Sequence, residues 1–234
     1  MEEIRQILAG LDWSPLFISI KTGIAATIVS FFLGIWAARK MLKAKTGLRA
    51  VLDGILTLPL VLPPTVAGFF LLLIFSTRRT VGSYLYTTFD IKIVQSWAGC
   101  VIAATVIAFP LMYRNARAAF EQVDVNLIYA GQTLGMSDRK IFWKVIVPAA
   151  GPGIASGTVL AFARAIGEYG ATSMLAGNIL GKTRTVSVAI ASETAAGNYD
   201  VAGFWVVVIV VISFVIVVLI NIVSGRGMKS RRWI

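Results

Sequence analysis
The chain has 234 residues, of which 57% are hydrophobic and only 14% are charged. Soluble domains carry about 25% charged residues, so this composition excludes a soluble globular domain and indicates an integral membrane protein. The net charge of +11 comes from basic residues in short segments beside hydrophobic runs, which argues against a nucleic-acid-binding face. With one cysteine and no histidine, the sequence argues against an intrachain disulfide, a metal cluster and histidine-based catalysis.

The amino-terminal segment, residues 1–13, carries Glu2, Glu3 and Asp12 against a single basic residue, Arg5. A cleaved signal peptide begins with a basic region and ends at a small-residue cleavage site, and this segment has neither. We therefore expect the first hydrophobic run to be retained as a membrane helix.

Five hydrophobic runs are long enough to cross a bilayer, which takes about 20 residues of helix. They are Ser14–Ala38, Gly54–Ser76, Ile93–Tyr113, Val145–Ala163 and Val201–Gly225. A sixth helix, short or broken, is possible in Tyr169–Ala196, which is nearly apolar and rich in small residues. The sequence predicts an all-α, polytopic membrane protein with a single domain over residues 1–234, with five or six spans.

The basic residues favour one orientation of these spans. With five spans, residues 39–49, 114–144 and 226–232 fall on one side of the membrane and hold 14 of the 22 basic residues. Cytoplasmic loops carry the excess of Lys and Arg. The pattern therefore predicts a cytoplasmic carboxyl terminus and an external amino terminus.

The second run contains three prolines within six residues, Pro59, Pro63 and Pro64. Each proline removes a backbone donor and clashes with the preceding helical turn, so the helix must break here. Broken backbone at membrane depth is tolerated where it lines a cavity or is buried in protein. We interpret the break as the kinked wall of a translocation path, or else as a helix boundary near the membrane surface.

After this run, Ser76–Ser83 is expected to form an external loop. Its Arg78 and Arg79 would either favour an approaching anion, hold an external partner, or simply be solvated.

A patterned polar segment at about residues 121–147 stands out from its hydrophobic surroundings. Val123, Leu127, Ala130 and Leu134 recur at helical spacing, and Gly135 is a suitable stop for that helix. Ser137 is placed to cap a second helix with the apolar residues Ile141, Phe142 and Val145. Pro148 then restarts the chain into the next run. The segment predicts two helices joined by a glycine turn at the membrane surface.

The fourth run offers a small-residue face of the kind through which membrane helices approach closely. Its members are Gly151, Gly153, Gly157, Ala161 and Ala165. Arg164 and Glu168 follow, four residues apart, so they can form an ion pair within one helix. Ionisable residues at such depth face a protein interior or a watery cavity, which indicates a structural or gating pair. The alternative is a pair at the interfacial end of the helix.

The polar segment resembles the cytoplasmic loop of importer-type ABC permeases, in which E-A-A, three residues, Gly, nine residues and I-x-L-P follow one another. The matching positions here are Tyr129-Ala130-Gly131, Gly135, Val145, Val147 and Pro148. Two residues depart from the pattern, because Tyr129 replaces Glu and Gly131 replaces the second Ala. The glycine turn is kept, while one carboxylate contact is lost.

Two further strings resemble the permeases for molybdate, tungstate and sulfate, and the resemblance spans about Pro15 to Ser224. They are Phe162-Ala-Arg-Ala-Ile-Gly-Glu-Tyr-Gly-Ala-Thr172 and Gly181-Lys-Thr-Arg-Thr185. The string Leu58–Pro64 favours molybdate, whereas Arg78-Arg79 and Glu193–Asn198 look more like tungstate permeases.

The resemblance implies a permease subunit in the cytoplasmic (inner) membrane of a prokaryote, forming a homodimer with the pathway on its two-fold axis. Two separate ATPase subunits would use ATP and magnesium, because no G-x-x-x-x-G-K-[ST] motif occurs in this chain. An external binding protein would deliver the oxyanion, and this chain would bind no cofactor and no nucleic acid. Contact with the ATPase would fall on Tyr129, Ala130, Gly131, Leu134, Gly135, Met136 and Pro148.

The pathway should bind its anion weakly, so we expect its lining to be small and hydroxylated. With the prolines and the ion pair, the candidates are Pro63, Pro64, Thr65, Gly68, Ser156, Thr158, Arg164, Glu168 and Thr172. Serine and threonine in a membrane helix equally often bond their own backbone.

Two other classes of function remain as alternatives. An ion-driven carrier usually shows charged groups at mid-membrane and an internal repeat, and neither is clear here. A membrane-embedded enzyme would need a catalytic set that the sequence does not supply.

Overall fold
The computed structural model describes the backbone of residues 12–229 and the side chains of residues 12–218 and 222. The acidic amino-terminal residues Glu2 and Glu3, with Arg5, lie outside the described residues, as does the end of the basic tail after Lys229.

The described part of the chain is helical and contains no strand, as the sequence predicts. The helices are α2 (Ser14–Leu42), α3 (Thr46–Val61), α4 (Pro64–Phe75), α5 (Thr80–Phe89), α6 (Trp97–Glu121), α7 (Val125–Thr133), α8 (Asp138–Ile141), a π-helix (Phe142–Ile146), α9 (Val147–Ala149), α10 (Gly151–Ile166), α11 (Gly170–Leu175), α12 (Val186–Ala195) and α13 (Tyr199–Lys229).

Three helices, α2, α6 and α13, are long and apolar enough to cross a membrane unbroken. Two further helix pairs have the length and composition of a span when each pair is counted as one, and both are bent: α3 meets α4 at 108°, and the α8–α9 segment meets α10 at 72°. These five correspond to the five predicted runs. The possible sixth helix is two short pieces, because α11 has 6 residues and α12 has 10. Both fall well short of about 20 residues, so the described residues offer no sixth span.

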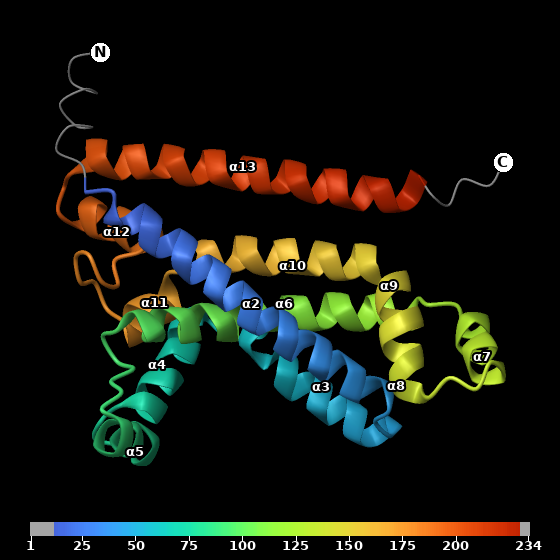
Figure 1. Cartoon of the computed structure of the whole chain (residues 1–234). Coiled ribbons are helices and arrows are strands. Elements are labelled where there is room, and N and C mark those ends of the chain that lie inside the picture. The colour runs from blue at the N-terminus through green and yellow to red at the C-terminus, as the bar shows by residue number, and fades with distance from the viewer. Residues whose placement is uncertain (1–11, 230–234) are drawn as a thin grey trace.

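The core of the bundle is formed where α2 crosses α6 and α10 (Figure 1). Its contact surfaces are made of alanine and glycine, which let membrane helices approach closely. A Cβ atom added to Gly34 of α2 would lie 2.8 Å from Met112 Cγ and 3.1 Å from Tyr113 N, both in α6. A Cβ atom on Gly157 of α10 would lie 2.7 Å from Asn115 Cβ. The predicted small-residue face of the fourth run is therefore used against α6.

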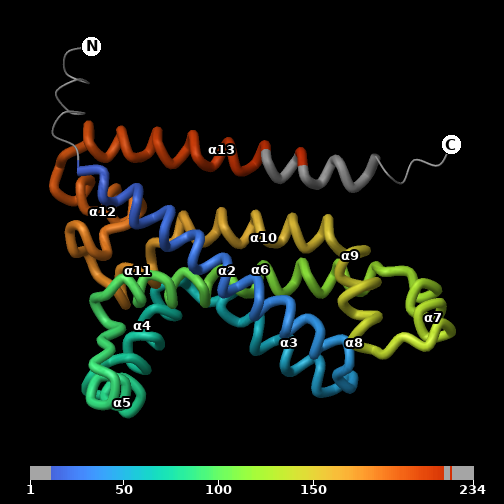
Figure 2. Tube along the Cα trace, viewed as in Figure 1, coloured from blue at the N-terminus to red at the C-terminus, as the bar shows by residue number. Residues whose placement is uncertain are grey.

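The predicted proline break is confirmed. Pro59 lies inside α3, Pro63 is the N-cap of α4, and Pro64 opens α4, so the helix stops at Val61 and restarts in a new direction. The 108° bend sends α3 and α4 in different directions, and α3 lies at the edge of the bundle with none of its residues buried. Figure 2 shows the trace running along α3 toward the bundle, and then away from it along α4 to α5.

The predicted external loop at Ser76–Ser83 is only partly correct, because a helix, α5, begins at Thr80. Gly82 allows this helix to pack directly on the end of α4: an added Cβ atom would lie 2.3 Å from the carbonyl oxygen of Phe75. Arg78 and Arg79 are exposed beside it, which fits the solvated alternative.

The two ends of the bundle carry different elements (Figure 1). One end holds α7 and α8 together with the end of α2 and the start of α3, and the opposite end holds α5, α11 and α12. This grouping is the alternation of loops that the five-span prediction requires.

The close crossing of α2 and α6 leads to a first prediction. In Gly34→Val, the new side chain meets backbone and side-chain atoms of α6, and such overpacking costs about 1–3 kcal/mol. Gly54→Val is the matched control, since a Cβ atom at this other helical glycine has no neighbour within 4 Å. Thermal unfolding of the detergent-solubilised protein should show a lower midpoint for Gly34→Val only. Equal midpoints for the two variants would contradict the close crossing.

Candidate functional site
The central polar segment folds as two helices joined by a glycine turn, as predicted. The Asp124 carboxylate accepts the N–H of Asn126 at 2.9 Å and caps the start of α7. Gly135 ends the helix with φ +68°, a conformation that favours glycine, and the N–H of Met136 bonds the carbonyl of Gly131 at 3.0 Å. Ser137 is the N-cap of α8 by position, but its side chain makes no capping hydrogen bond.

Helix α7 is exposed, and large apolar side chains are among its exposed residues. The exposed fraction is 58% at Tyr129 and 80% at Leu134, and Ala130 is also exposed. Gly131 is the exception, because it is buried against the side chain of Ile141. Ile141 belongs to the second helix of the hairpin, α8 with the π-helix that continues it, which we call the second arm. The predicted coupling residues thus divide into a buried glycine, which lets the two arms touch, and an apolar surface free to meet another protein.

The second arm is fixed on the bundle. Ile141 and Phe142 are 3% exposed, and the Phe142 ring packs against Phe120 of α6 with its centroid 5.3 Å away. The guanidinium of Arg39 in α2 lies 4.3 Å from the same ring. Lys43 Nζ also reaches the Asp138 carboxylate at 2.7 Å, although both groups are exposed and such pairs contribute little. The second arm of the hairpin therefore contacts the ends of both α2 and α6.

Pro148 does not restart the chain as predicted. The helix runs through it without a break, and the turn comes later, between α9 and α10. Proline has no N–H, so Pro148 cannot bond the carbonyl four residues back. The regular α-helical hydrogen bonding is therefore interrupted in the turn before it. The turn before it is a π-helix, in which the N–H of Val147 reaches the carbonyl of Phe142.

The predicted ion pair is formed at the end of α10. Glu168 Oε2 lies 2.7 Å from Arg164 Nη1, and the side chains are 1% and 31% exposed, respectively. Glu168 Oε1 accepts the N–H of Ala171 at 2.7 Å and so satisfies a donor in the first turn of α11. Glu168 lies beyond the last residue of α10, Ile166, so the pair is at a helix end rather than within one helix, and its carboxylate is buried.

Helix α11 in turn packs tightly on the proline break. A Cβ atom on Gly68 of α4 would lie 2.7 Å from Ala171 Cα, and one on Gly170 would lie 2.9 Å from Pro64 Cβ. The structure thereby brings the predicted residues Pro64 and Gly68 against a helix more than 100 positions later in the sequence. Gly170 and Ala171 stand in the matched string at residues 162–172 but are not among the predicted pathway residues.

The remaining pathway candidates lie in different surroundings. Thr65 is exposed at the start of α4, and Thr172 is buried in α11. Ser156 is partly buried in α10. Thr158 donates to the carbonyl of Ile154 in its own helix at 2.8 Å, which is the backbone-bonding alternative.

A polar network that the sequence analysis missed holds α3 against α6. The buried Tyr113 hydroxyl donates to Asp53 Oδ1 at 2.7 Å, and Arg117 pairs with the same carboxylate. Arg117 Nε also reaches Glu121 Oε1 at 3.0 Å, and Glu121 contacts Arg49. The only sequence signal was the spacing of Arg117 and Glu121, four residues apart.

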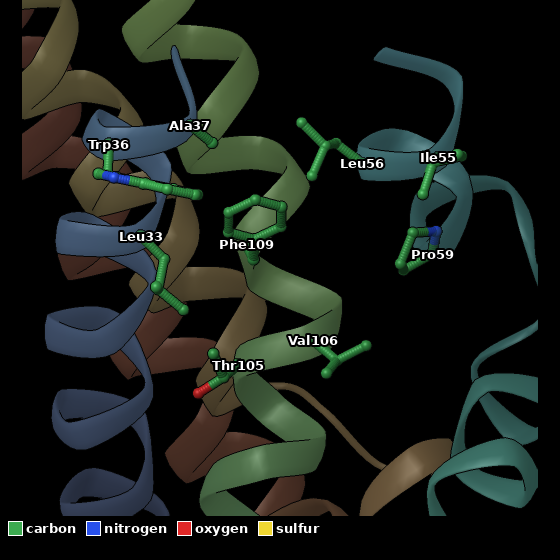
Figure 3. Close-up of a pocket in the computed structure, with 9 residues that line it drawn as sticks. All are labelled: Leu33, Trp36, Ala37, Ile55, Leu56, Pro59, Thr105, Val106 and Phe109. Carbon is green, nitrogen blue, oxygen red and sulfur yellow. The ribbon is translucent and has the colours of Figure 1, made fainter. Parts of the chain in front are cut away.

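Beside this network, a hollow of about 330 Å³ opens between α2, α3 and α6 (Figure 3). Its lining is apolar except for Thr105, so it offers an oxyanion no set of donors. The lining residues are Leu33, Trp36, Ala37, Ile55, Leu56, Pro59, Thr105, Val106 and Phe109. None of the pathway candidates is among them. Within residues 12–229, no group of three His, Cys, Asp or Glu side chains is placed to hold a metal ion.

Comparison with known proteins gives one family. The family described as "Binding-protein-dependent transport system inner membrane component" matches residues 30–225. A putative molybdenum transport system permease of Bacillus subtilis is 40% identical over 215 residues, covering 92% of this chain and 95% of that protein. A molybdenum transport system permease of Escherichia coli is 43% identical over 184 residues, covering 79% and 80%. A probable sulfate transport system permease of Chlorokybus atmophyticus is 31% identical, covering 89% and 72%.

Solved structures show the same fold at low sequence identity. A chain of the inward-facing MetNI methionine ABC transporter has a TM-score of 0.69 at 15% identity, covering 97% of this chain and 99% of its own length. A chain of a bacterial ABC transporter involved in alginate import has a TM-score of 0.72 at 16% identity, covering 97% and 83%.

The two side chains of the ion pair differ in their exposure to solvent, and this difference leads to a second prediction. Arg164→Gln leaves a buried carboxylate without its partner, and breaking a buried pair costs about 3–5 kcal/mol. Glu168→Gln leaves a guanidinium that is 31% exposed, while the amide oxygen can still accept the N–H of Ala171. Arg164→Gln should therefore lower the thermal midpoint more than Glu168→Gln does, and the double variant should recover part of the loss. A larger loss in Glu168→Gln would show that the carboxylate is not the group that needs a partner.

Proposed function
The chain belongs to the family of binding-protein-dependent transport system inner membrane components, and we propose that it is the membrane subunit of an ATP-driven importer that carries molybdate into the cytoplasm. Two molybdenum permeases match it at 40% and 43% identity, whereas the sulfate permease matches at 31%. Molybdate, tungstate and sulfate are all tetrahedral oxyanions, so the two other anions are the alternatives to test.

The observation that carries this proposal is that α7 exposes large apolar side chains while the second arm of the hairpin is packed on the bundle. Tyr129 and Leu134 are 58% and 80% exposed, while Phe142 in the second arm is 3% exposed and packed on α6. An apolar surface that is anchored to the bundle in this way can bind another protein and be displaced by it. We assign that role to separate ATPase subunits, which hydrolyse ATP with magnesium, because this chain lacks a phosphate-binding glycine loop.

The translocation step follows from the broken spans. Closure of the ATPase subunits would displace the hairpin and, through Phe142, the cytoplasmic ends of α2 and α6. The contact of α4 with α11 would form one wall of the path, with Thr65 at its exposed edge. A second copy of the chain would supply the opposite wall. Glu168 neutralises Arg164, so the wall would bind the anion weakly and allow its release.

Helix α7 lies at the same end of the bundle as the most basic segments, residues 39–49 and 114–144. By the positive-inside rule this end is cytoplasmic, with the amino terminus outside. A third prediction tests this orientation in a Cys100→Ser chain. Leu134→Cys should react with an impermeant maleimide only after right-side-out vesicles are opened, and Leu180→Cys should react before. Leu134 and Leu180 are 80% and 62% exposed, respectively. The opposite order of labelling would invert the topology.

A fourth prediction tests substrate and coupling together, using ATP hydrolysis by the complete complex in lipid. Binding protein loaded with molybdate should stimulate hydrolysis, and binding protein without anion should not. Tungstate-loaded and sulfate-loaded protein are run in parallel, and stimulation by either alone would reassign the substrate.

In the same assay, Leu134→Glu should abolish stimulation and weaken co-purification of the ATPase, because a charge replaces an exposed apolar contact. Leu180→Glu is the matched control for co-purification, since each leucine precedes a glycine with φ +68° and only Leu134 lies on the hairpin. Retention of a stimulated ATPase in Leu134→Glu would remove α7 as the coupling surface.

A further inference from the structure
Lys21 is a cation within a membrane-spanning helix. It lies seven residues after Ser14, the first residue of α2, which is about 10 Å along the axis at 1.5 Å per residue. With 29 residues, α2 is longer than a hydrocarbon core about 30 Å thick requires. Lys21 therefore lies near the boundary of the hydrocarbon core, where a long amine side chain reaches the headgroup level.

The surroundings of Lys21 form an apolar groove of about 520 Å³ on the outside of α2. Its lining residues are Phe17, Ile20, Lys21, Ile24, Ala25, Ile28 and Trp97. All but Trp97 come from α2, and Phe17, Ile24 and Ile28 are about half exposed or more. The groove thus runs along the helix, in the direction that a lipid acyl chain takes in the bilayer.

The amine is held at one place in this groove. Lys21 Nζ lies 4.1 Å from the centroid of the Trp97 ring, which is a cation–π contact. The Trp97 Nε1–H donates to Thr22 Oγ1 at 3.0 Å, so the ring is fixed in turn by α2. Trp97 is the first residue of α6, and tryptophan is typical of the headgroup level of a membrane.

Lys21 has no carboxylate partner among the residues that the structure describes. Among the described residues, the ion pairs involve Lys43, Arg49, Arg117, Arg164 and Arg184 as cations, and Lys21 is in none of them. Even the partly exposed Arg164 has its buried carboxylate. A cation at the headgroup level attracts the anionic groups of lipids, so the geometry favours a lipid phosphate as its partner.

We propose that this groove binds an anionic phospholipid of the leaflet at the amino-terminal end of α2. Its phosphate would lie on Lys21, and one acyl chain would follow Ile24 and Ile28. A transported oxyanion does not fit, because apart from Lys21 the lining offers only the Trp97 N–H, which Thr22 already accepts. The other hollow, between α2, α3 and α6, has no cation in its lining and should show no such preference (Figure 3).

The test is native mass spectrometry of the purified complex, equilibrated with an equal mixture of phosphatidylglycerol and phosphatidylcholine. The wild type should retain phosphatidylglycerol preferentially. Lys21→Gln should reduce that preference about fivefold, the usual effect of one basic residue near an anionic membrane surface. Lys21→Arg should keep it. Ile24→Trp, which fills the groove but keeps the cation, should reduce retention of both lipids.

Lys92→Gln is the matched control, because Lys92 is an exposed cation shortly before α6, at the same end of the bundle, and does not line the groove. It should leave the lipid preference unchanged. Equal retention of phosphatidylglycerol by the wild type and Lys21→Gln would overturn the proposal. So would displacement of the lipid by molybdate, or its loss when two copies of the chain associate. The first of these two results would mean that Lys21 binds the transported anion, and the second that it contacts another copy of the chain.

Discussion
Inside a bilayer the backbone has no water to bond, so every N–H and C=O group must find its partner within the protein. This constraint decides where the chain can break. At the first break Pro63 and Pro64 have no N–H to satisfy, and the N–H of Leu62 still reaches the carbonyl of Leu58 at 3.1 Å. At the start of α11 a side chain takes over, because the Glu168 carboxylate accepts the N–H of Ala171 at 2.7 Å.

The candidate site follows from these two breaks. Short helices that cannot cross the membrane are held by contacts that only glycine permits, Gly68 against α11 and Gly170 against α4. The buried Glu168 needs a cation, and Arg164 supplies it one turn earlier in α10. At the start of α11, one small region therefore contains a bonded backbone N–H, a close helix contact and a neutralised carboxylate. At the other end of α10, the 72° bend leads into the arm that carries the exposed helix α7.

The features that could be predicted from the sequence are those that neighbouring residues determine. The proline break, the glycine turn at Gly135 and the pairing of Arg164 with Glu168 all depend on separations of four residues or fewer. The network of Asp53 with Tyr113 could not be predicted, because it joins residues 60 positions apart whose proximity depends on how α3 packs on α6. The π-helix before Pro148 was also missed, since the sequence shows that a bond is lost but not how the neighbouring turns adjust.

We propose that the breaks and the hairpin belong to a membrane subunit that is moved by a separate ATPase. The most direct measurement is uptake of labelled molybdate into sealed proteoliposomes that contain the complete complex and its binding protein. We predict accumulation that requires both ATP and the loaded binding protein, and that persists when proton and sodium gradients are collapsed. Uptake by this chain alone, driven by an imposed ion gradient without ATP, would contradict that role and identify an ion-driven carrier.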